Sequence, residues 1–314
     1  MGKATFIAMG IDVGGTKTAF GVVRFPAGEV LVEKEIPTGA DRSAKKVLDD
    51  IVRAASKLAV DNRLKGATLS AVGFGICELV GRRGEILSHN LLNWKTAQIQ
   101  RQFADLAPVT LEADVRAGAL AEALFGAGKS YRIFLYVTVG TGISCSLVID
   151  GVPYLGMHGA TGTMASSSLT WVCETCGDIN KRTLEQIASG PALVSRLNQE
   201  QPGAAVTGQD VLAAAAQGNA TAECVIRSAA TALGSTISLL VNVLDPEAVI
   251  IGGGLGLSKG IFWKTLIEST RNHIWSDIHR DVPILPAATG VRCAMIGAAA
   301  AAWKAHMRQA SAKR

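Results

Sequence analysis

Short apolar runs rich in strand-forming residues alternate along this chain with segments whose apolar residues recur at helical spacing. Two such runs, residues 5–9 and 19–23, flank a segment that contains Gly14 and Gly15. Apolar runs joined through a glycine pair predict a β-hairpin. Between residues 43 and 58 the apolar positions follow the helical period, with charges on the opposite face, and predict an amphipathic helix.

The alternation continues to the end of the chain. Short apolar runs predict buried strands at residues 69–76, 109–114, 132–139, 143–149 and 248–251. Helical spacing and alanine-rich composition predict helices at 117–125, 184–197, 208–217, 220–244 and 297–306, the second of them broken by Gly190 and Pro191. Glycine-rich turns directly follow several of these strands.

Composition narrows the class of protein. The chain has 314 residues, of which 48% are hydrophobic and 18% charged, so it is globular and long enough for two lobes. The formal charge of +5 is spread without a basic run, which argues against nucleic acid and suits a small anionic ligand. Six scattered cysteines and a start without a signal-peptide pattern indicate a cytoplasmic protein with reduced thiols. The apolar segment 228–244 ends abruptly at Asp245, so we expect a buried helix and no membrane partner.

The connection of the first hairpin carries residues suited to a phosphate site. Asp12 lies at the end of the first strand, and Gly14 and Gly15 let backbone N–H groups approach an anion. Thr16 and Lys17 add a hydroxyl and a cation, and the Asp12 carboxylate suits a hydrated divalent cation. No helix follows these glycines, so the segment is neither a Walker loop nor a dinucleotide motif. It is interpreted as a site for a polyphosphate and its Mg²⁺, with an ordinary hairpin turn as the alternative.

A similar arrangement occurs again further along the chain. Thr138, Gly140, Thr141 and Gly142 lie at a second junction of two apolar strands. Two phosphate-binding hairpins, one in each lobe, would hold one polyphosphate from both sides. The repeat suggests an internal duplication.

A run of three glycines, Gly252, Gly253 and Gly254, follows the strand predicted at 248–251. Backbone without side chains lets a flat base or a ribose lie close, so this run suits a nucleoside. A glycine loop required only for packing is the alternative.

Taken together, these stretches resemble a known family. The motifs GIDVGGTKT, EADVRAGALAEALFGAG, YVTVGTGISCSLVIDG, HGATG, LEQIASGPAL and LDPEAVIIGGGLG occur in the order found in ROK-family sugar kinases. The resemblance covers nearly the whole chain. It implies an α/β protein with the two-lobed actin-like ATPase (ribonuclease H-like) fold of hexokinases, with ATP in the cleft between the lobes.

The resemblance also implies how the chain is divided. We expect an N-terminal lobe at 1–115 and a C-terminal lobe at 116–314, with the last helix free to pack back on the N-terminal lobe. Repressors of the family carry a helix-turn-helix domain before the first strand. This chain begins at that strand, so no DNA-binding role is expected.

By resemblance, several residues receive roles. Asp12 to Lys17 match the first phosphate motif, Thr138 to Gly142 the second, and Gly252 to Gly256 the adenosine motif. Asp114 matches the catalytic base, which takes the proton of the acceptor hydroxyl as it attacks the γ-phosphorus. ATP and Mg²⁺ are the implied cofactors, with Asp12 as the Mg²⁺ residue through ATP. A helix N-cap is the alternative role for Asp114.

The chain departs from the family pattern on the acceptor side. Ala113 stands where hexose-specific members have Asn. Thr163 stands at the place of a Glu that binds sugar hydroxyls, and Ser166 at the place of a His that contacts both sugar and zinc. These replacements leave the phosphate motifs untouched.

The zinc-binding loop of the family is also incomplete in this chain. Cys173 and Cys176 remain, but Thr183 stands at the place of a third Cys. Two thiolates do not complete a tetrahedral site, so no structural zinc is expected. The pair is interpreted as plain reduced thiols, with a redox pair or residual metal binding as alternatives.

Further candidate substrate contacts remain. Asn90 lies in a loop that helps to hold the sugar in the family, and Glu185 matches a sugar-contacting Glu. Glu78 follows the strand at 69–76 and is interpreted either as a contact to an amino or hydroxyl group or as a solvated loop acid. His158 is either a donor to a substrate oxygen or structural.

The sequence thus predicts a retained ATP half and an altered sugar half. A site built to hydrogen-bond particular hydroxyls discriminates strongly by them, so these replacements predict an acceptor other than plain glucose. We expect an ATP-dependent kinase for an amino sugar, a deoxy sugar or a cyclitol, with Asp114 as general base. The alternatives are a non-catalytic sugar or nucleotide sensor and a kinase that uses polyphosphate as donor. A homodimer is left open.

Overall fold

The computed structural model describes residues 5–64 and 67–312, which form two compact units. Unit 1 contains the described residues of Met1–Arg132, Ser146–Thr161 and Val291–Arg314. Unit 2 contains Ile133–Cys145 and Gly162–Gly290. Each unit has its own hydrophobic core, so the side chains of each are fixed mainly by packing within it.

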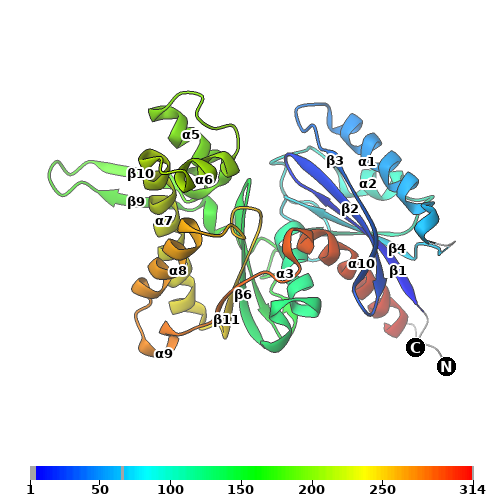
Figure 1. Ribbon diagram of the computed structural model, residues 1–314. Coiled ribbons are helices and arrows are strands. Elements are labelled where there is room, and N and C mark those ends of the chain that lie inside the picture. Colours follow the sequence, from blue (N-terminus) through cyan, green and yellow to red (C-terminus); the bar gives the residue numbers. More distant parts are fainter. Residues whose placement is uncertain (1–4, 65–66, 313–314) are drawn as a thin grey trace. The chain divides into compact units, whose positions relative to one another are not determined.

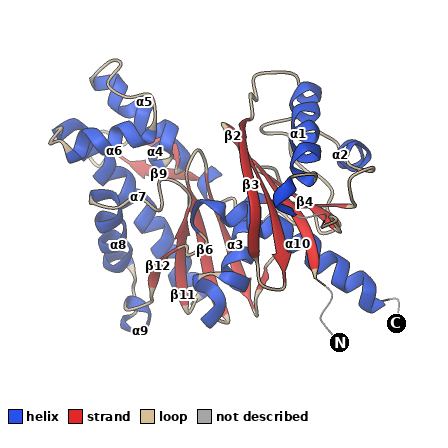
Figure 2. Ribbon diagram, turned by 45° about the vertical axis from the view of Figure 1, so that its right-hand side comes forward, coloured by secondary structure: helices blue, strands red, loops and turns tan. Residues whose placement is uncertain are grey.

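Unit 1 is built on a five-stranded sheet of order β3-β2-β1-β4-β5 (Figures 1 and 2). The first three strands form an antiparallel meander, whereas β4 and β5 continue the sheet from β1 in parallel. The predicted first hairpin is confirmed, because Val13 pairs with Thr18 across the Gly14–Gly15 connection. The strands are β1 (Phe6–Val13), β2 (Lys17–Phe25), β3 (Glu29–Pro37), β4 (Ala71–Ile76) and β5 (Val109–Ala113).

The predicted amphipathic helix of unit 1 is also confirmed. Ser43 caps this helix by accepting the N–H of Lys46. The buried apolar residues of the helix join the core that contains Phe20 and Phe74 of the sheet. The helices of unit 1 are α1 (Ala44–Ala59), α2 (Thr96–Gln102), α3 (Asp114–Phe125) and α10 (Cys293–Ala312), and its short 3₁₀ turns are η1 (Asn62–Leu64) and η2 (Ala127–Ser130).

The C-terminal helix α10 packs against β1, β4 and α3 at glycine positions. At Gly10 in β1 and Gly73 in β4, a Cβ atom would overlap backbone carbonyl oxygens of α10. In the same way, Gly297 of α10 leaves room for the carbonyl of Ala117 in α3. These close backbone approaches hold the C-terminal helix in unit 1 with the N-terminal sheet.

Unit 2 contains most of a second five-stranded sheet, of order β12-β11-β6-β7-β8. β6 and β11 are parallel neighbours, and β7 continues along the chain from unit 2 into unit 1. The strands are β6 (Ile133–Val139), β7 (Ile143–Ile149), β8 (Val152–Pro153), β11 (Ala248–Gly252) and β12 (Ile284–Pro286). A separate antiparallel hairpin consists of β9 (Ser168–Val172) and β10 (Ile179–Thr183).

The helices of unit 2 include the predicted ones in their order, with the break at Gly190 and Pro191, and two further helices after residue 260 that were not predicted. They are α4 (Glu185–Ala188), α5 (Gly190–Glu200), α6 (Gly208–Ala216), α7 (Ala220–Leu244), α8 (Ile261–His273) and α9 (Asp277–Arg280), with the short turn η3 (Met164–Ser166), while η4 (Gly290–Arg292) links the two units along the chain.

By length and composition, α7 could cross a membrane. Half of its most apolar window is buried, however, and its buried residues belong to the core of unit 2, where the helix packs against α8. It ends at Asp245, which adopts a left-handed conformation with φ of 48°. These contacts are those of a core helix.

The start of α3 and the division of the chain into units differ from the sequence-based expectation. α3 begins at Asp114 rather than at residue 117, because the chain passes from β5 into the helix without a connecting loop. All of α3 belongs to unit 1, as does the segment Ser146–Thr161, whereas the expected division placed a boundary after residue 115.

The glycine contacts of α10 lead to a test of the packing. We expect Gly73→Ala to lower the free energy of unfolding by about 2 kcal/mol, because the added methyl overlaps a backbone carbonyl that cannot turn away. Gly75→Ala is the matched control on the same strand, since its nearest neighbour would be the Ile11 oxygen at 3.4 Å. Urea unfolding of both variants measures the difference, and equal losses would contradict the packing.

Candidate active site

Four ionisable side chains of unit 1 meet at one edge of its sheet. Because β1, β4 and β5 are parallel, their carboxyl ends lie at the same edge. Asp12 lies next to the end of β1, and Asp114 directly follows β5. Cys77 and Glu78 directly follow β4. The pKa of the Cys77 thiol is raised by burial and by the charges of the other three, so the four groups interact.

Asp114 is the first residue of α3, not its N-cap. The N-cap is Ala113, which has no capping side chain, and the Asp114 carboxylate instead accepts the N–H of Val115 at 2.6 Å. Burial is the main reason that the pKa of Asp114 is raised to about 6; the Val115 bond and Arg116 lower this pKa, and Glu78 raises it. A carboxylate with a pKa close to neutrality is suited to accept a proton.

Asp12 is perturbed in the same direction. Burial raises its pKa to about 7, with the negative charge of Asp114 as the second cause. Two carboxylates that repel each other at a strand edge provide oxygen donors for a divalent cation, which would offset both charges. The residues therefore fit Mg²⁺.

The β1–β2 connection is fixed by a buried hydroxyl pair. The Thr38 hydroxyl donates to the Gly14 carbonyl at 2.7 Å, and its oxygen lies 2.9 Å from that of Thr18. The N–H of Gly14 donates across the turn to the Lys17 carbonyl at 3.0 Å. The connection is thus shaped by hydrogen bonds while Thr16 at its tip stays exposed.

Lys17 is the cation of this connection. Its ammonium donates to Glu35 at 2.6 Å, and both side chains are more than half exposed, at 57% and 55%. An exposed pair of this kind contributes little stability, so an anionic ligand can replace Glu35 at low cost.

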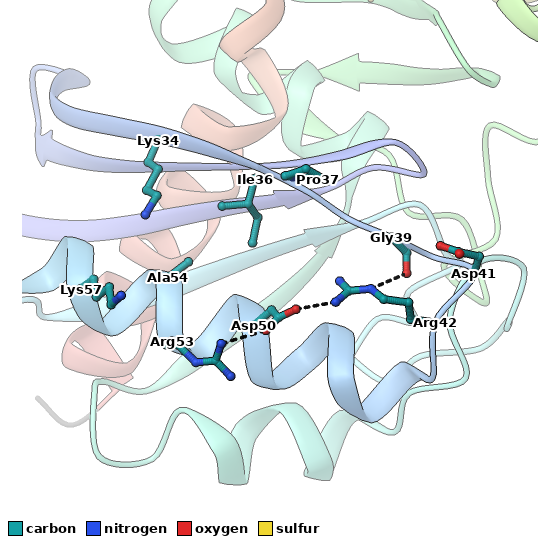
Figure 3. Close-up of a pocket in the computed structure, with 10 residues that line it drawn as sticks. All are labelled: Lys34, Ile36, Pro37, Gly39, Asp41, Arg42, Asp50, Arg53, Ala54 and Lys57. Atoms are coloured by element: carbon teal, nitrogen blue, oxygen red, sulfur yellow. Dashed lines mark hydrogen bonds and ion pairs between the residues drawn. The ribbon is translucent and has the colours of Figure 1, made fainter.

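A groove of about 440 Å³ lies between β3 and α1, next to Thr38 in the chain. Figure 3 draws the side chains that line it. Arg42 lines it, donating to Asp50 at 2.7 Å and to the Thr38 carbonyl at 3.0 Å. The Arg42 bond holds the pKa of Asp50 below its usual value. None of the residues that line this groove is a predicted site residue. We interpret the Arg42 side chain as structural, because it holds Thr38, which in turn holds the β1–β2 connection.

Glu78 is 7% exposed, so its interpretation as a solvated loop acid is wrong. One carboxylate oxygen accepts the Ser88 hydroxyl at 2.6 Å and the N–H of Asn90 at 2.7 Å. The other accepts the N–H groups of Leu91 at 2.7 Å and Leu92 at 3.4 Å. The loop that carries Asn90 is therefore hydrogen-bonded to Glu78.

Arg116 joins three segments of unit 1. It is 2% exposed, and its guanidinium bonds to Glu112 at 2.6 Å. It also donates to the carbonyls of Val80 at 2.6 Å and Gly159 at 2.7 Å. The start of α3, the segment after β4 and the segment after His158 are thereby fixed to one another.

The other acceptor candidates of unit 1 are accessible. The Asn90 side chain is exposed and its amide donates to the Ser88 hydroxyl at 3.2 Å. His158 is exposed as well, immediately before Gly159. The structure thus joins Asn90 to Glu78 directly, and Arg116 joins Gly159, next to His158, to the Asp114 end of α3.

In unit 2 the second phosphate motif and the adenosine motif meet. β6 and β11 are parallel, and Thr138 pairs with Gly252 where both strands end. The Val139 carbonyl accepts the N–H groups of Leu255 and Gly256, both at 3.0 Å. Two glycine segments that are far apart in sequence therefore share one edge of the sheet.

The glycines of the adenosine motif serve different purposes. Gly253 has φ of +82°, and a Cβ there would overlap the Val139 backbone. Gly256 has no room for a Cβ because of the Gly252 carbonyl. At Gly254, by contrast, a Cβ would have no neighbour within 4 Å among the described residues. Packing explains two of the glycines, whereas Gly254 leaves an open backbone surface.

The remaining predicted contacts also lie in unit 2. Glu185 is exposed at the start of α4 and accepts the N–H of Ile143 at 3.1 Å, next to Gly142 of the second phosphate turn. Gly140 of the same turn is held by Gly190, whose N–H donates to the Gly140 carbonyl at 2.8 Å. Thr163 is exposed.

The cysteines are free thiols. Cys173 and Cys176 lie in the β9–β10 hairpin, where hydrogen bonds from Cys176 and Thr175 lower the pKa of Cys173. Within residues 5–64 and 67–312, no group of three or more His, Cys, Asp or Glu side chains is arranged to hold a metal ion.

Several residues that shape the site were not found by sequence reasoning. Arg116 stands four positions after Glu112, a spacing that signals an ion pair on a helix, but β5 ends between them. Thr38 and Arg42 lie in a connection without a motif. Only the tertiary contacts identify them.

The buried ion pair leads to a stability test. We expect Arg116→Met to lower the free energy of unfolding by about 3 kcal/mol, because it leaves Glu112 and two carbonyls without their partner. Arg83→Met is the control, since Arg83 is 92% exposed and should change stability by less than about 0.5 kcal/mol. Chemical denaturation compares the two, and similar values would contradict the assigned role of Arg116.

Known proteins resemble the chain along almost its full length. The ROK family model matches residues 8–305. A glucokinase from Streptomyces coelicolor is 27% identical over 313 residues, covering 93% of this chain and 96% of the relative. Kanosamine kinase from Amycolatopsis mediterranei is 29% identical over 303 residues, covering 94% and 95%.

A solved structure gives the same result. A ROK family glucokinase from Streptomyces griseus, in complex with glucose and AMPPNP, has a TM-score of 0.80 and 26% identity and covers 95% of this chain and 99% of its own. The predicted α/β actin-like ATPase fold is thereby confirmed. Because the family model matches most of the described residues, the chain belongs to the ROK family.

Proposed function

We propose that this protein is an ATP-dependent phosphotransferase that phosphorylates a hydroxyl of a small sugar-like acceptor, with Asp114 as general base. The observation that carries the proposal is the position of Asp114, at the carboxyl edge of the sheet with a pKa of about 6. Membership of a family with glucokinase and kanosamine kinase relatives supports sugar phosphotransfer.

In the proposed reaction Asp114 accepts a proton. The acceptor O–H loses this proton to the carboxylate while its oxygen forms a bond to the γ-phosphorus, and the bond to the bridging oxygen breaks to release ADP. The carboxylate must be ionised for this step. Arg116 and Glu112 fix the start of α3, so Asp114 is held in place rather than carried on a mobile loop.

The nucleotide would be bound by the glycine segments. We assign Gly14 to Lys17 and Thr138 to Gly142 to the phosphates, and Gly252 to Gly254 to the adenosine, where the open backbone at Gly254 suits a flat base. Asp12 would hold Mg²⁺ together with the nucleotide. Mg²⁺ supplies positive charge that neutralises the phosphoryl oxygens.

The acceptor is proposed to be an amino sugar, a deoxy sugar or a cyclitol in preference to glucose. Ala113, Thr163 and Ser166 replace residues with which the family binds glucose, so different hydroxyls are selected. The carboxylates near Asp114 add a physical reason, because a protonated amine offsets their mutual repulsion. We place the protein in the cytoplasm, with small molecules as its partners.

The proposal is tested with a panel of acceptors. Glucose, glucosamine, 2-deoxyglucose and myo-inositol are each assayed with ATP and with polyphosphate in the presence of Mg²⁺. We expect ATP to serve as donor and one of the last three acceptors to exceed glucose at least tenfold in kcat/KM. Glucose as the best acceptor would refute the shift in specificity, and no turnover with any acceptor would favour a sensor.

Asp114→Asn tests the general base in the same assay. We expect kcat to fall by a factor of about 10² to 10⁴. The pKa of Asp114 is raised in the folded state, so its ionisation destabilises the fold as pH rises through about 6, and Asn removes that cost. At pH 8 the Tm should therefore be equal or higher. Asp281→Asn, at an exposed aspartate, is the control, and unchanged turnover in Asp114→Asn would exclude the base.

The pH profile gives a further test. Protonated Asp114 cannot accept a proton, so kcat/KM should fall tenfold per pH unit below about pH 6, where an ordinary aspartate would still be ionised. Glu78 and Arg116 are the charged groups that shift the pKa of Asp114, and Asp12, whose own pKa is raised to about 7, interacts with Asp114. Circular dichroism at pH 5 verifies that the protein stays folded. Activity that persists unchanged to pH 4.5 would contradict the assignment.

A further inference from the structure

The loop from Ser88 to Leu92 takes its shape from one buried carboxylate. Glu78 accepts the Ser88 hydroxyl and the consecutive backbone N–H groups of Asn90, Leu91 and Leu92. These donors belong to irregular backbone between β4 and α2, and they follow the antiparallel bridge of that segment between Val80 and Ile86. The loop conformation therefore depends on Glu78.

The hydrogen-bonding capacity of Glu78 is filled. An ionised carboxylate has about four acceptor positions, and four donors occupy them here. Charge-assisted bonds of this kind offset the cost of burying the charge. Glu78 is therefore engaged by its own loop, and we assign it to that loop in preference to a direct contact with a substrate amine or hydroxyl.

The contacts of the same segment lead to Asp114. Val80, two residues after Glu78, accepts a hydrogen bond from Arg116 at the start of α3. The negative charge of Glu78 also contributes to the raised pKa of Asp114. Glu78 thus lies between the loop that presents Asn90 and the carboxylate proposed as base.

We propose that Glu78 is a positioning residue that holds the Ser88–Leu92 loop in its acceptor-binding conformation and thereby selects among sugar-like acceptors. This inference rests on the proposed function for its kinetic part. The loop presents the exposed Asn90 side chain, and it does so only while its backbone N–H groups point at Glu78.

The experiment compares two variants with a matched control. Glu78→Gln keeps the size of the side chain but turns an NH₂ donor toward N–H donors, so at least one backbone N–H loses its acceptor. Ser88→Ala removes one of the four donors to Glu78, together with the acceptor of the Leu79 N–H and of the Asn90 amide, and serves as the second variant if Glu78→Gln does not fold. Glu85→Gln alters a neighbouring, more exposed carboxylate and is the control.

Amide hydrogen exchange tests the loop without any assay of activity. In Glu78→Gln we expect protection at Asn90, Leu91 and Leu92 to fall at least tenfold, with a smaller loss in Ser88→Ala and none in Glu85→Gln. Unchanged protection in both loop variants would overturn the structural part of the inference, whatever reaction the protein catalyses.

Kinetics test the consequence for the acceptor. In Glu78→Gln the KM for the acceptor should rise at least tenfold while the KM for ATP stays within twofold, and the ratio of kcat/KM between two acceptors should change. A general loss of structure would change both KM values. Lost protection with unchanged acceptor KM and unchanged selectivity would overturn the inference and leave the proposed function intact.

The pH profile separates positioning from simple loss of packing. Removing the charge of Glu78 should move the acidic limb of kcat/KM to lower pH, because that charge raises the pKa of Asp114. A limb that moves to higher pH would contradict the arrangement. If the wild-type protein turns over none of the acceptors, the proposed function fails, while hydrogen exchange still decides the role of Glu78 in the loop.

Discussion

The parallel register of β1, β4 and β5 is the constraint on which the candidate site of unit 1 depends. It places three strand ends at one edge, so that Asp12, Glu78 and Asp114 become neighbours. Carboxylates that are buried together repel one another and lose hydration, and both effects favour the protonated form. The pKa values of Asp12 and Asp114 are raised accordingly. A cation, whether a metal ion or the ammonium of an amino sugar, is the kind of ligand that such an edge favours.

Hydrogen bonding distinguishes the carboxylates of this edge. Glu78 accepts four donors and so fixes a loop, whereas Asp114 accepts the N–H of Val115 and keeps acceptor capacity for a substrate hydroxyl. The cations differ in a similar way, since the buried Arg116 guanidinium is bonded through all three of its nitrogens, while the exposed Lys17 pairs with the exposed Glu35, which an anionic ligand can replace. Saturated charges build the site, and unsaturated charges are left for chemistry.

Unit 2 reaches its site by a different route, through backbone instead of charge. The ends of β6 and β11 lie side by side, and Val139 connects the two glycine segments by accepting two N–H groups. Gly253 and Gly256 are required because a Cβ would overlap backbone atoms there. Where no such overlap exists, at Gly254, the backbone is open to a ligand. The β9–β10 hairpin of the same unit carries Cys173 and Cys176 as free thiols.

The sequence by itself determined the elements and the family. Alternating apolar runs gave most strands and helices, and the glycine motifs in their order indicated the ROK fold, because local spacing and motif order are properties of the chain alone. It could not give the start of α3 at Asp114, the burial of Glu78 or the bonds of Arg116 and Thr38. In the sequence, a carboxylate at a loop position looks the same whether it faces solvent or, as Glu78 does, one hydroxyl and three N–H donors. Only the tertiary structure decided between them, since burial and partners come from residues that are distant in the chain.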